Sequence, residues 1–589
     1  MQAGGFVGRG FDIRTGDCTD AVKSRVSDAF DIVPAASQGV DVAEQQKSLD
    51  RTHRRVIFAS SLGTVFEWYD FYLYGALLTV ITKKFFAGMN DTTAFLFALL
   101  AFAAGFFVRP FGALVFGRLG DLVGRKHTFL ITIVIMGAST ALVGVLPSYE
   151  TIGVAAPVIL IVLRLLQGLA LGGEYGGAAT YVAEHAPDGK RGLYTSWIQT
   201  TATMGLFLSL LVILGCRSLL SPEAFDEWGW RLPFLLSVVL LGWSVYIRLQ
   251  LQESPVFQEI KAEGKLSKAP LTESFGRWSN LKIVLLALFG ATAGQAVVWY
   301  GGQFYALFFL EKVLQVESKA ANLVMAAALL IATPFFVVFG ALSDKIGRKK
   351  IVLTGCLLAV LTYFPIFHGL ALYANPALDA ANKASPVVVV AHPDECSFQF
   401  DPVGKRKYTT GCDMAKGALA RMGVSYSNQA GAAGLGMAQV KIGSTVLDIH
   451  SMEGAPDAAY VKKTQDEATA TIKAALTDAG YPAKADMSAF NFPMVILLCT
   501  ILVIYVTMVY GPIAAWLVEL FPARIRYTSM SLPYHIGNGW FGGFLPVTSF
   551  AIVAATGNIY NGLWYPVIVA SITIVVGALF LRETKDSPA

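Results

Sequence analysis

The chain has 589 residues, of which 54% are hydrophobic and 15% are charged, and its formal net charge is +5. Its mean hydropathy of +0.55 excludes a soluble protein of this length. The small positive charge does not indicate nucleic-acid binding, and we expect the chain to lie in a lipid bilayer.

Residues 1–53 contain no apolar core segment, cleavable signal peptide or periodic pattern, so we expect a mobile cytoplasmic tail. Twelve apolar runs follow, and each can cross the hydrocarbon core, which takes about 20 residues per helix. The runs cover residues 56–82, 94–116, 128–146, 155–179, 197–216, 232–251, 282–310, 321–341, 350–373, 492–519, 528–556 and 560–581. None alternates like a barrel strand, so we predict an all-α membrane protein with twelve transmembrane helices.

The basic residues of the loops predict the orientation of these helices. Eleven lie in one set of loops: Arg118, Arg125, Lys126, Lys190, Arg191, Lys345, Arg348, Lys349, Lys350, Arg524 and Arg526. Six lie in the other set: Lys83, Lys84, Arg217, Arg231, Lys312 and Lys319. The richer set is expected in the cytoplasm, which places both termini there in a multi-pass protein of the cell inner membrane. A cytoplasmic linker, 252–281, then joins two six-helix bundles. The first bundle covers residues 54–251, and the second is made of two segments, 282–373 and 492–584.

A charged turn with the pattern G-x-L-x-D-x-x-G-R-K occurs once in each bundle, at 117–126 and 340–349. Its acidic and basic residues are four positions apart, so they can form a local ion pair, and the carboxylate can cap a helix. Its glycines allow a tight turn and close helix contact. Repeated turns of this kind indicate a duplicated bundle that moves something across a bilayer. The residues concerned are Gly117, Asp121, Gly124 and Arg125, and Gly340, Asp344, Gly347 and Arg348.

A second repeat locates an insertion. The pattern E-x-x-P-x-x-x-R occurs at 184–191 and 519–526, an offset of 335 residues, whereas the charged turn repeats at 223. The difference of 112 residues fits the polar stretch 374–491, which the topology places outside the cytoplasm. Strands at 386–390 and 444–449 and a helix from Glu467 to Ala479 predict a small α/β domain there.

Two of the six cysteines, Cys396 and Cys412, fall in this insertion. We predict that they form a disulfide, because the compartment outside the cytoplasm preserves such bonds. The alternative is a pair of unrelated free thiols. The cluster His392 to Cys396 is too tightly spaced for a metal site on one helical face, so we expect no metal.

Several motifs together resemble one known family. They are Glu67-Trp68-Tyr69-Asp70-Phe71, Arg109-Pro110-Phe111-Gly112, Gly172-Gly173-Glu174-Tyr175-Gly176-Gly177, Arg231-Leu232-Pro233-Phe234 and Glu253-Ser254-Pro255-Val256-Phe257. The chain is similar to the metabolite–proton symporter branch of the major facilitator superfamily. The resemblance implies a central cavity that opens alternately to either side and proton-driven uptake of a small carboxylate or zwitterion. It also implies that the repeated turns latch the bundles on the cytoplasmic side in the outward-open state.

Ionisable residues at mid-membrane usually mark function. Glu67 and Asp70 share a face of the first helix, and we expect them to couple transport to protons. Arg109 and Arg164 are the candidate charge partners or anion anchors. The structural alternative is a buried pair of Asp70 with Arg109.

Further polar residues could line the cavity. Glu174 lies among four glycines, either facing the cavity or bonding between helices. Gln295, Trp299 and Gln303 form a polar stripe on the seventh helix beside Tyr300, and could bind substrate or a neighbouring helix. His535 is interpreted as structural.

We therefore predict a monomeric proton symporter that imports a small organic acid and needs no cofactor beyond the proton gradient. The alternatives are an osmolyte carrier for proline or betaine, or a membrane receptor that uses the inserted domain. The chain has no Walker loop, nucleophile elbow or metal cluster, so an enzyme is not expected.

Overall fold

The computed structural model describes residues 61–66, 68–70, 72–86, 91–399, 408–432, 436–452, 454 and 457–586. Of the two units into which the chain is divided, the second covers residues 56–589. The predicted tail, 1–53, lies outside the described residues, so all that follows concerns the second unit.

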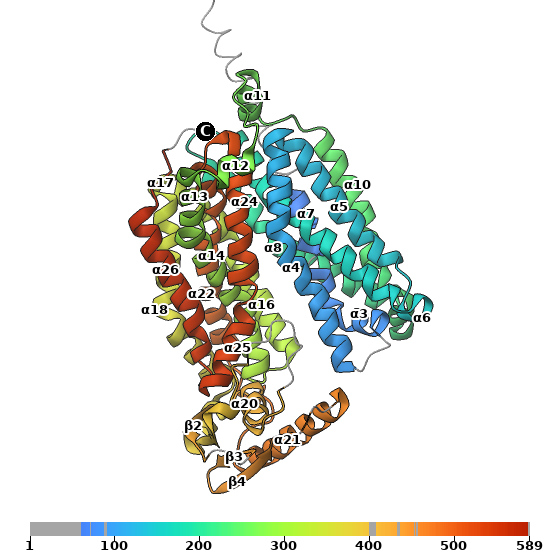
Figure 1. Cartoon of the computed structure of the whole chain (residues 1–589), viewed down its shortest axis with the longest axis vertical. Coiled ribbons are helices and arrows are strands. Elements are labelled where there is room, and N and C mark those ends of the chain that lie inside the picture. Colours follow the sequence, from blue (N-terminus) through green and yellow to red (C-terminus); the bar gives the residue numbers. More distant parts are fainter. Residues whose placement is uncertain are drawn as a thin grey trace, which may run out of the picture. The chain divides into compact units, whose positions relative to one another are not determined.

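The first half of this unit is helical and contains three helices longer than 25 residues. Residues 61–66 are helical, and the elements after them are α3 (Leu78–Phe85), α4 (Asp91–Leu122), α5 (Arg125–Val145), α6 (Tyr149–Ile152), α7 (Ala155–His185), α8 (Arg191–Leu219), α9 (Pro222–Ala224), η1 (Phe225–Gly229) and α10 (Arg231–Leu249). The predicted linker contains α11 (Pro255–Ala262) and α12 (Pro270–Phe275). Figure 1 shows α4, α5, α7, α8 and α10 side by side as one bundle.

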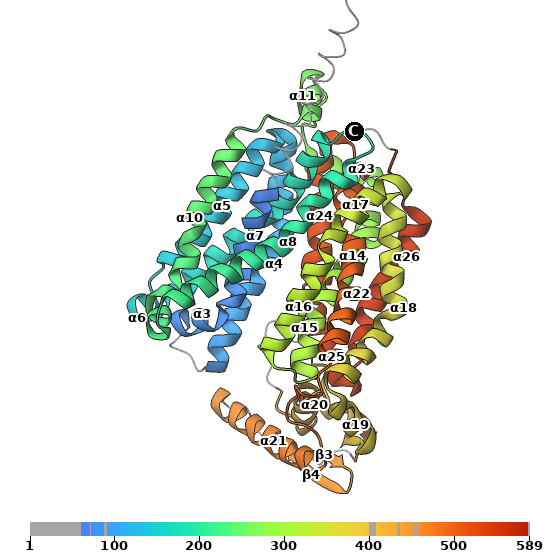
Figure 2. The ribbon, with the colours of Figure 1, turned by 180° about the vertical axis from the view of Figure 1, so that it is seen from behind.

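The second half is also helical on both sides of the insertion. Before it lie α13 (Trp278–Ala287), η2 (Leu288–Thr292), α14 (Ala293–Tyr300), η3 (Gly301–Tyr305), α15 (Ala306–Phe308), η4 (Phe309–Val313), α16 (Ser318–Ala332), α17 (Pro334–Ile346) and α18 (Arg348–Ala374). After it lie α22 (Phe492–Tyr510), α23 (Ile513–Leu520), η6 (Ala523–Ile525), α24 (Arg526–Ile536), η7 (Gly537–Gly542), α25 (Leu545–Thr556), η8 (Asn561–Leu563) and α26 (Trp564–Phe580). Figure 2 shows the same arrangement from behind.

Ten segments of the described chain are long and apolar enough to cross a membrane, and they correspond to the third to twelfth predicted runs. Large apolar side chains cover their outer surface: Leu211 is 66% exposed and Leu579 is 70% exposed. Polar side chains such as Thr201 and Thr507 are instead buried. Apolar residues outside and polar residues inside are what a bilayer requires, so the chain is a multi-pass membrane protein.

Helices α4 and α7 pack closely because glycines line their contact. A Cβ at Gly112 would lie 2.0 Å from the carbonyl oxygen of Leu169, and one at Gly172 would lie 2.2 Å from that of Arg109. Either substitution would push the backbones apart. The glycine-rich segment of α7 is therefore a packing surface, as its pattern predicts.

The insertion contains a four-stranded sheet in the order β2-β1-β3-β4. Its strands are β1 (Val387–Ala391), β2 (Tyr426–Ala430), β3 (Met437–Ile442) and β4 (Thr445–His450). The strand β1 runs parallel to β2 and antiparallel to β3, and β3 pairs antiparallel with β4. The helices are α19 (Pro376–Ala384), α20 (Gly411–Arg421) and α21 (Ala458–Asp478), with a short turn η5 (Pro393–Glu395).

Two strands and one helix of the insertion were predicted; the strands begin one residue later than expected, and the helix begins nine residues earlier. The helix begins at Ala458 rather than Glu467, because the side chain of Asp457 caps it by accepting a hydrogen bond from the N–H of Tyr460. The sequence patterns missed α19, α20, β2 and β3. Cys396 and Cys412 are joined by a disulfide.

The insertion is bonded to the end of α25. The N–H of Tyr426 donates to the carbonyl oxygen of Gly557 at 2.7 Å, and its hydroxyl donates to that of Ala554. The side-chain amide of Asn428 donates to the carbonyl oxygen of Ala555 at 3.2 Å. Buried residues of the sheet also belong to the same hydrophobic cluster as those of the second bundle. The sheet is therefore attached firmly to this bundle.

Candidate functional site

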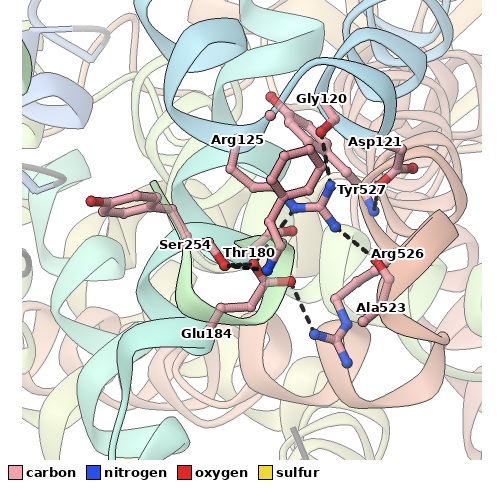
Figure 3. A network of polar contacts seen from close by, with 12 residues as sticks. Gly120, Asp121, Arg125, Thr180, Glu184, Ser254, Ala523, Arg526 and Tyr527 are labelled. Atoms are coloured by element: carbon pink, nitrogen blue, oxygen red, sulfur yellow. Dashed lines mark hydrogen bonds and ion pairs between the residues drawn. The ribbon is translucent and has the colours of Figure 1, made fainter. Parts of the chain in front are cut away.

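The first copy of the repeated turn joins the two bundles. Asp121, at the end of α4, forms an ion pair of 3.1 Å with Arg125. Its carboxylate also accepts hydrogen bonds from the N–H groups of Tyr527 and Thr528, at 3.3 and 2.9 Å, at the start of α24. Arg125 in turn donates to the carbonyl oxygen of Ala523 at 2.7 Å (Figure 3). A carboxylate of the first bundle thus caps a helix of the second.

The second copy makes the reciprocal contact. Asp344, at the end of α17, forms an ion pair of 2.7 Å with Arg348. Its carboxylate accepts hydrogen bonds of 2.8 Å from the N–H groups of Gly192 and Leu193, at the start of α8. A carboxylate of the second bundle thus caps a helix of the first. Together, these two sets of contacts are called the latch below.

The second repeat supplies further charges to the latch. Glu184 lies 3.5 Å from Arg125 and 3.1 Å from Arg526 of the other bundle. At the equivalent place, Glu519 lies 3.0 Å from Arg348 and 3.8 Å from Arg191. The sequence placed these glutamates and arginines in a repeat but assigned them no role. Their recurrence as the same E-x-x-P-x-x-x-R pattern in both halves was the signal.

The two turn glycines have backbone conformations that other residues rarely adopt. Gly124 has a φ of 130° and Gly347 a φ of 115°. A Cβ at Gly124 would lie 2.3 Å from the carboxylate of Glu253, and one at Gly347 would lie 2.2 Å from that of Glu583. These glutamates accept hydrogen bonds from the first N–H groups of α5 and α18. Glycine therefore makes room for a carboxylate cap in both halves.

Small and large residues are exchanged between the two halves of the latch. A Cβ at Gly120 would lie 2.1 Å from the ring of Tyr527, and one at Gly192 would lie 2.3 Å from the hydroxyl of Ser343. Gly120 and Ser343 are equivalent in the repeated turn. Gly192 and Tyr527 are equivalent too, since each follows the arginine that ends the second repeat, Arg191 or Arg526. The tyrosine hydroxyl donates to the carbonyl oxygen of Gly173 at 2.6 Å. Tyr527 therefore fills a glycine-lined space in the first bundle (Figure 3).

Asp70 is buried among hydroxyl groups. Its carboxylate accepts hydrogen bonds from Thr140 at 2.7 Å and Ser237 at 3.0 Å. The side-chain amide of Gln167 donates to Thr140 at 2.7 Å and its oxygen accepts from Arg164 at 2.6 Å. Arg164 is therefore connected to Asp70 through the side chains of Gln167 and Thr140. The sequence indicated Arg164 as a candidate partner but not these two connecting residues. The predicted coupling partner Glu67 lies outside the described residues.

Arg109 lies in a different place from Asp70, so the structural alternative of an Asp70–Arg109 pair is wrong. It lines a small cavity to which both halves contribute. The other residues of this wall are Trp68 and Tyr175 from the first half, and Trp299, Tyr300, Tyr510, Tyr534, His535 and Asn538 from the second. The cavity volume is about 20 Å³, close to that of a single water molecule. Little free volume therefore remains between these side chains.

Aromatic rings form most of the cavity wall. The rings of Tyr175 and Tyr534 stack at 3.7 Å between centroids, which joins α7 to α24. Their neighbour Tyr510 shares a hydrogen bond of 2.7 Å with the hydroxyl of Tyr534. Trp299 packs against Trp68 at 5.6 Å. Of the stripe predicted on the seventh helix, Trp299 lines this cavity beside Tyr300, whereas Gln295 and Gln303 are not part of its wall. The three tyrosines on other helices were missed.

Three predicted cavity residues make other contacts. Glu174 forms a buried ion pair of 3.0 Å with Arg248 of α10, which the sequence did not single out. Gln295 exchanges two hydrogen bonds with Asn538, of 3.2 and 3.1 Å. Gln303 is buried in η3 away from the cavity wall. For Glu174 and Gln295, these contacts fit the alternative that their side chains bond to a neighbouring helix and do not face the cavity.

Comparison with known proteins gives consistent matches. Residues 56–275 match the family model "Sugar (and other) transporter". The chain is 36% identical to the alpha-ketoglutarate permease of Escherichia coli K12, over 57% of this chain and 76% of the permease. It is 35% identical to the shikimate transporter of the same organism, over 55% of this chain and 74% of that transporter. It is 34% identical to the proline/betaine transporter of that organism, over 53% of this chain and 64% of the transporter.

Solved structures support the same fold. A double-tryptophan mutant of XylE has a TM-score of 0.59 at 15% identity, covering 91% of this chain and 98% of that one. The proton:xylose symporter XylE bound to 6-bromo-6-deoxy-D-glucose has a TM-score of 0.57 at 14% identity, with the same coverage. The chain is therefore a transporter and not an enzyme, and it belongs to the metabolite transporter family of the major facilitator superfamily.

Proposed function

We propose that the protein imports a small carboxylated metabolite together with protons, by alternating access across the cell inner membrane. The observation that carries this proposal is the cavity between the halves, where Arg109 is surrounded by aromatic rings. A guanidinium holds a carboxylate through two parallel hydrogen bonds, and aromatic walls exclude water around it. The names of two relatives, a permease for alpha-ketoglutarate and a transporter for shikimate, indicate carboxylate cargo.

The topology belongs to the same proposal. Twelve transmembrane helices form two six-helix bundles in a monomer, with both termini in the cytoplasm. Residues 374–491 form an extracytoplasmic α/β domain between the ninth and tenth helices. The excess of basic residues in the loops that carry the latch supports this orientation. In this orientation the latch closes the cytoplasmic side, so the structure corresponds to an outward-facing state.

Proton coupling is assigned to Asp70 together with Glu67. A carboxylate in a bilayer loses hydration that stabilises its charge, so it can bind a proton when its hydrogen-bond partners change. The two hydroxyl groups bonded to Asp70 belong to α5 and α10. A movement of either helix would change how well the carboxylate is solvated. Arg164 acts through Gln167 and Thr140 as the charge partner of Asp70.

A second candidate function is uptake of proline or betaine. It is favoured by the same aromatic wall, because tyrosine and tryptophan faces attract a substrate cation. A zwitterion could place its carboxylate on Arg109 and its cation against Trp299, Tyr175 or Tyr534. One relative is named a proline/betaine transporter.

Uptake competition in proteoliposomes separates these functions. Labelled 2-oxoglutarate is offered with unlabelled shikimate, proline, betaine or xylose. We expect Arg109→Gln to raise the KM for a carboxylate at least tenfold, because one partner of a charged pair is lost. Arg277→Gln is the matched control, since Arg277 lies in the linker and is 66% exposed. Strong competition by betaine and none by organic acids would favour the osmolyte carrier.

A further inference from the structure

A second cavity lies in the insertion, far along the chain from Arg109. It has a volume of about 270 Å³ and lies where β1 and β2 end. These strands run parallel, with Val387 paired to Tyr426, so their carboxyl ends meet at one edge of the sheet. The carboxyl ends of parallel strands are where open α/β sheets bind ligands.

The cavity contains a buried cation. Lys416, from α20, lines it and is only 8% exposed. Among the described residues, none forms a hydrogen bond or ion pair with its ammonium group. Because the side chain is mostly buried, its ammonium is only partly hydrated, which disfavours the charge. An anion in the cavity would remove this penalty.

The acidic neighbour of Lys416 is already engaged. Asp413 lies one turn earlier on α20, and its carboxylate accepts hydrogen bonds from the N–H and hydroxyl of Ser397, at 2.8 and 2.6 Å. Burial lowers the pKa of the Lys416 ammonium, and the charge of Asp413 opposes that shift. Asp413 therefore stabilises the ammonium at a distance and leaves its hydrogen-bond donors available.

The other walls define the rest of the ligand. Val389, Ala391 and Pro393 contribute apolar side chains to the lining, and Asn428, Gln429 and Ala430 of β2 complete it. The volume is just below the usual range for small-molecule pockets, about 300–1,000 Å³. A ligand with one carboxylate and a short hydrocarbon tail matches this combination.

We propose that this cavity is a binding site for a small monocarboxylate, whose carboxylate pairs with Lys416 and whose apolar tail contacts Val389, Ala391 and Pro393. The site is separate from the transport cavity. It would give the insertion a ligand of its own.

Equilibrium binding of radiolabelled butyrate to the purified full-length protein tests this site. The protein carries Arg109→Gln, so that the central cavity does not contribute. We expect saturable binding that is weakened at least tenfold by Lys416→Met. The control is Lys383→Met, because Lys383 lies in the same insertion but is 74% exposed and paired with Asp379.

A second variant avoids dependence on one lysine. Ala430→Leu narrows the cavity from the end of β2 and leaves Lys416 in place. We expect Ala430→Leu to weaken butyrate binding as much as Lys416→Met does. In protein with an intact cavity, butanol should not compete with butyrate, because butanol lacks the charge. Absence of saturable binding in Arg109→Gln protein would overturn the proposal. Butyrate binding that is unchanged in both Lys416→Met and Ala430→Leu would also overturn it. If Lys416→Met does not fold, unchanged butyrate binding by Ala430→Leu is sufficient to overturn it. Failure of carboxylate uptake by the wild type would instead bear on the proposed transport function.

Discussion

The carboxylate of Asp344 accepts a hydrogen bond of 2.8 Å from the backbone N–H of Gly192, which lies at the start of a helix in the other bundle. Asp121 makes the equivalent contact with Thr528 at 2.9 Å in the opposite direction. Each bundle therefore caps a helix of its partner. Because a cap is lost when the bundles separate, these contacts stabilise the closed state of this side.

Removal of one cap should open the latch. An N-cap contributes about 0.5–2 kcal/mol, and about 1.4 kcal/mol changes an equilibrium tenfold. We expect Asp344→Ala to raise maleimide labelling of a cysteine introduced by Ser196→Cys about tenfold from the cytoplasmic side. Ser196 is buried against Gly340 in the closed latch. The control Asp188→Ala concerns a carboxylate that is 97% exposed, and equal labelling of both variants would contradict the latch.

The exchange of small and large residues predicts a specific rescue. Gly120→Ser places a side chain where the ring of Tyr527 lies, so the bundles cannot close fully. We expect the rate of uptake to fall at least tenfold. The double variant Gly120→Ser with Tyr527→Gly recreates the Ser343–Gly192 arrangement of the other half and should recover most of that loss. Wild-type transport by Gly120→Ser alone would show that the glycine is not needed for closure.

The Glu174–Arg248 pair should be structural. Arg248→Met leaves the Glu174 carboxylate buried without its partner, which costs about 3–5 kcal/mol. We expect a clearly lower Tm in detergent, and recovery of most of it when Glu174→Gln is added. The KM for substrate should be nearly unchanged in the double variant. A stable double variant that has lost substrate binding would instead place Glu174 in the transport site.

The disulfide should hold the insertion together. In the chain-entropy model, closing a loop of about 15 residues contributes about 3 kcal/mol. Replacing Cys396 and Cys412 with serine should therefore accelerate amide hydrogen exchange in β1 and α20 by about 100-fold. Cys216→Ser is the control, because Cys216 is a free thiol in α8. Unchanged exchange in the double serine variant would mean that the sheet is stable without the bond.

The ion pairs of the latch could be predicted from the sequence because their signals are local, whereas the joining of the bundles was implied only by the family resemblance. Asp121 and Arg125 are four residues apart, and the pattern recurs at Asp344 and Arg348, so both ion pairs were evident. The partner of Asp121 was not, since Thr528 lies 407 residues away and only the packing of the bundles brings them together. Repeats indicated equivalent positions but not which surfaces meet.

The cavity was harder to predict for a different reason. Tyr175, Tyr510 and Tyr534 each lie in an apolar helix, where a single tyrosine resembles one that faces lipid. Arg248 lay near the end of an apolar run and had no visible partner. The insertion had weak local signals: β2 begins with a buried Tyr426 and continues with polar, exposed residues, so it lacks the alternation expected of a strand.

The most direct measurement of the central claim is uptake of labelled 2-oxoglutarate by proteoliposomes with an imposed pH gradient. We predict accumulation that a protonophore abolishes. Asp70→Asn, and separately Glu67→Gln, should stop gradient-driven accumulation while exchange of internal for external substrate continues. The matched control is Glu150→Gln, an exposed carboxylate in α6. Gradient-driven accumulation at the wild-type level in both Asp70→Asn and Glu67→Gln would contradict proton coupling through this pair.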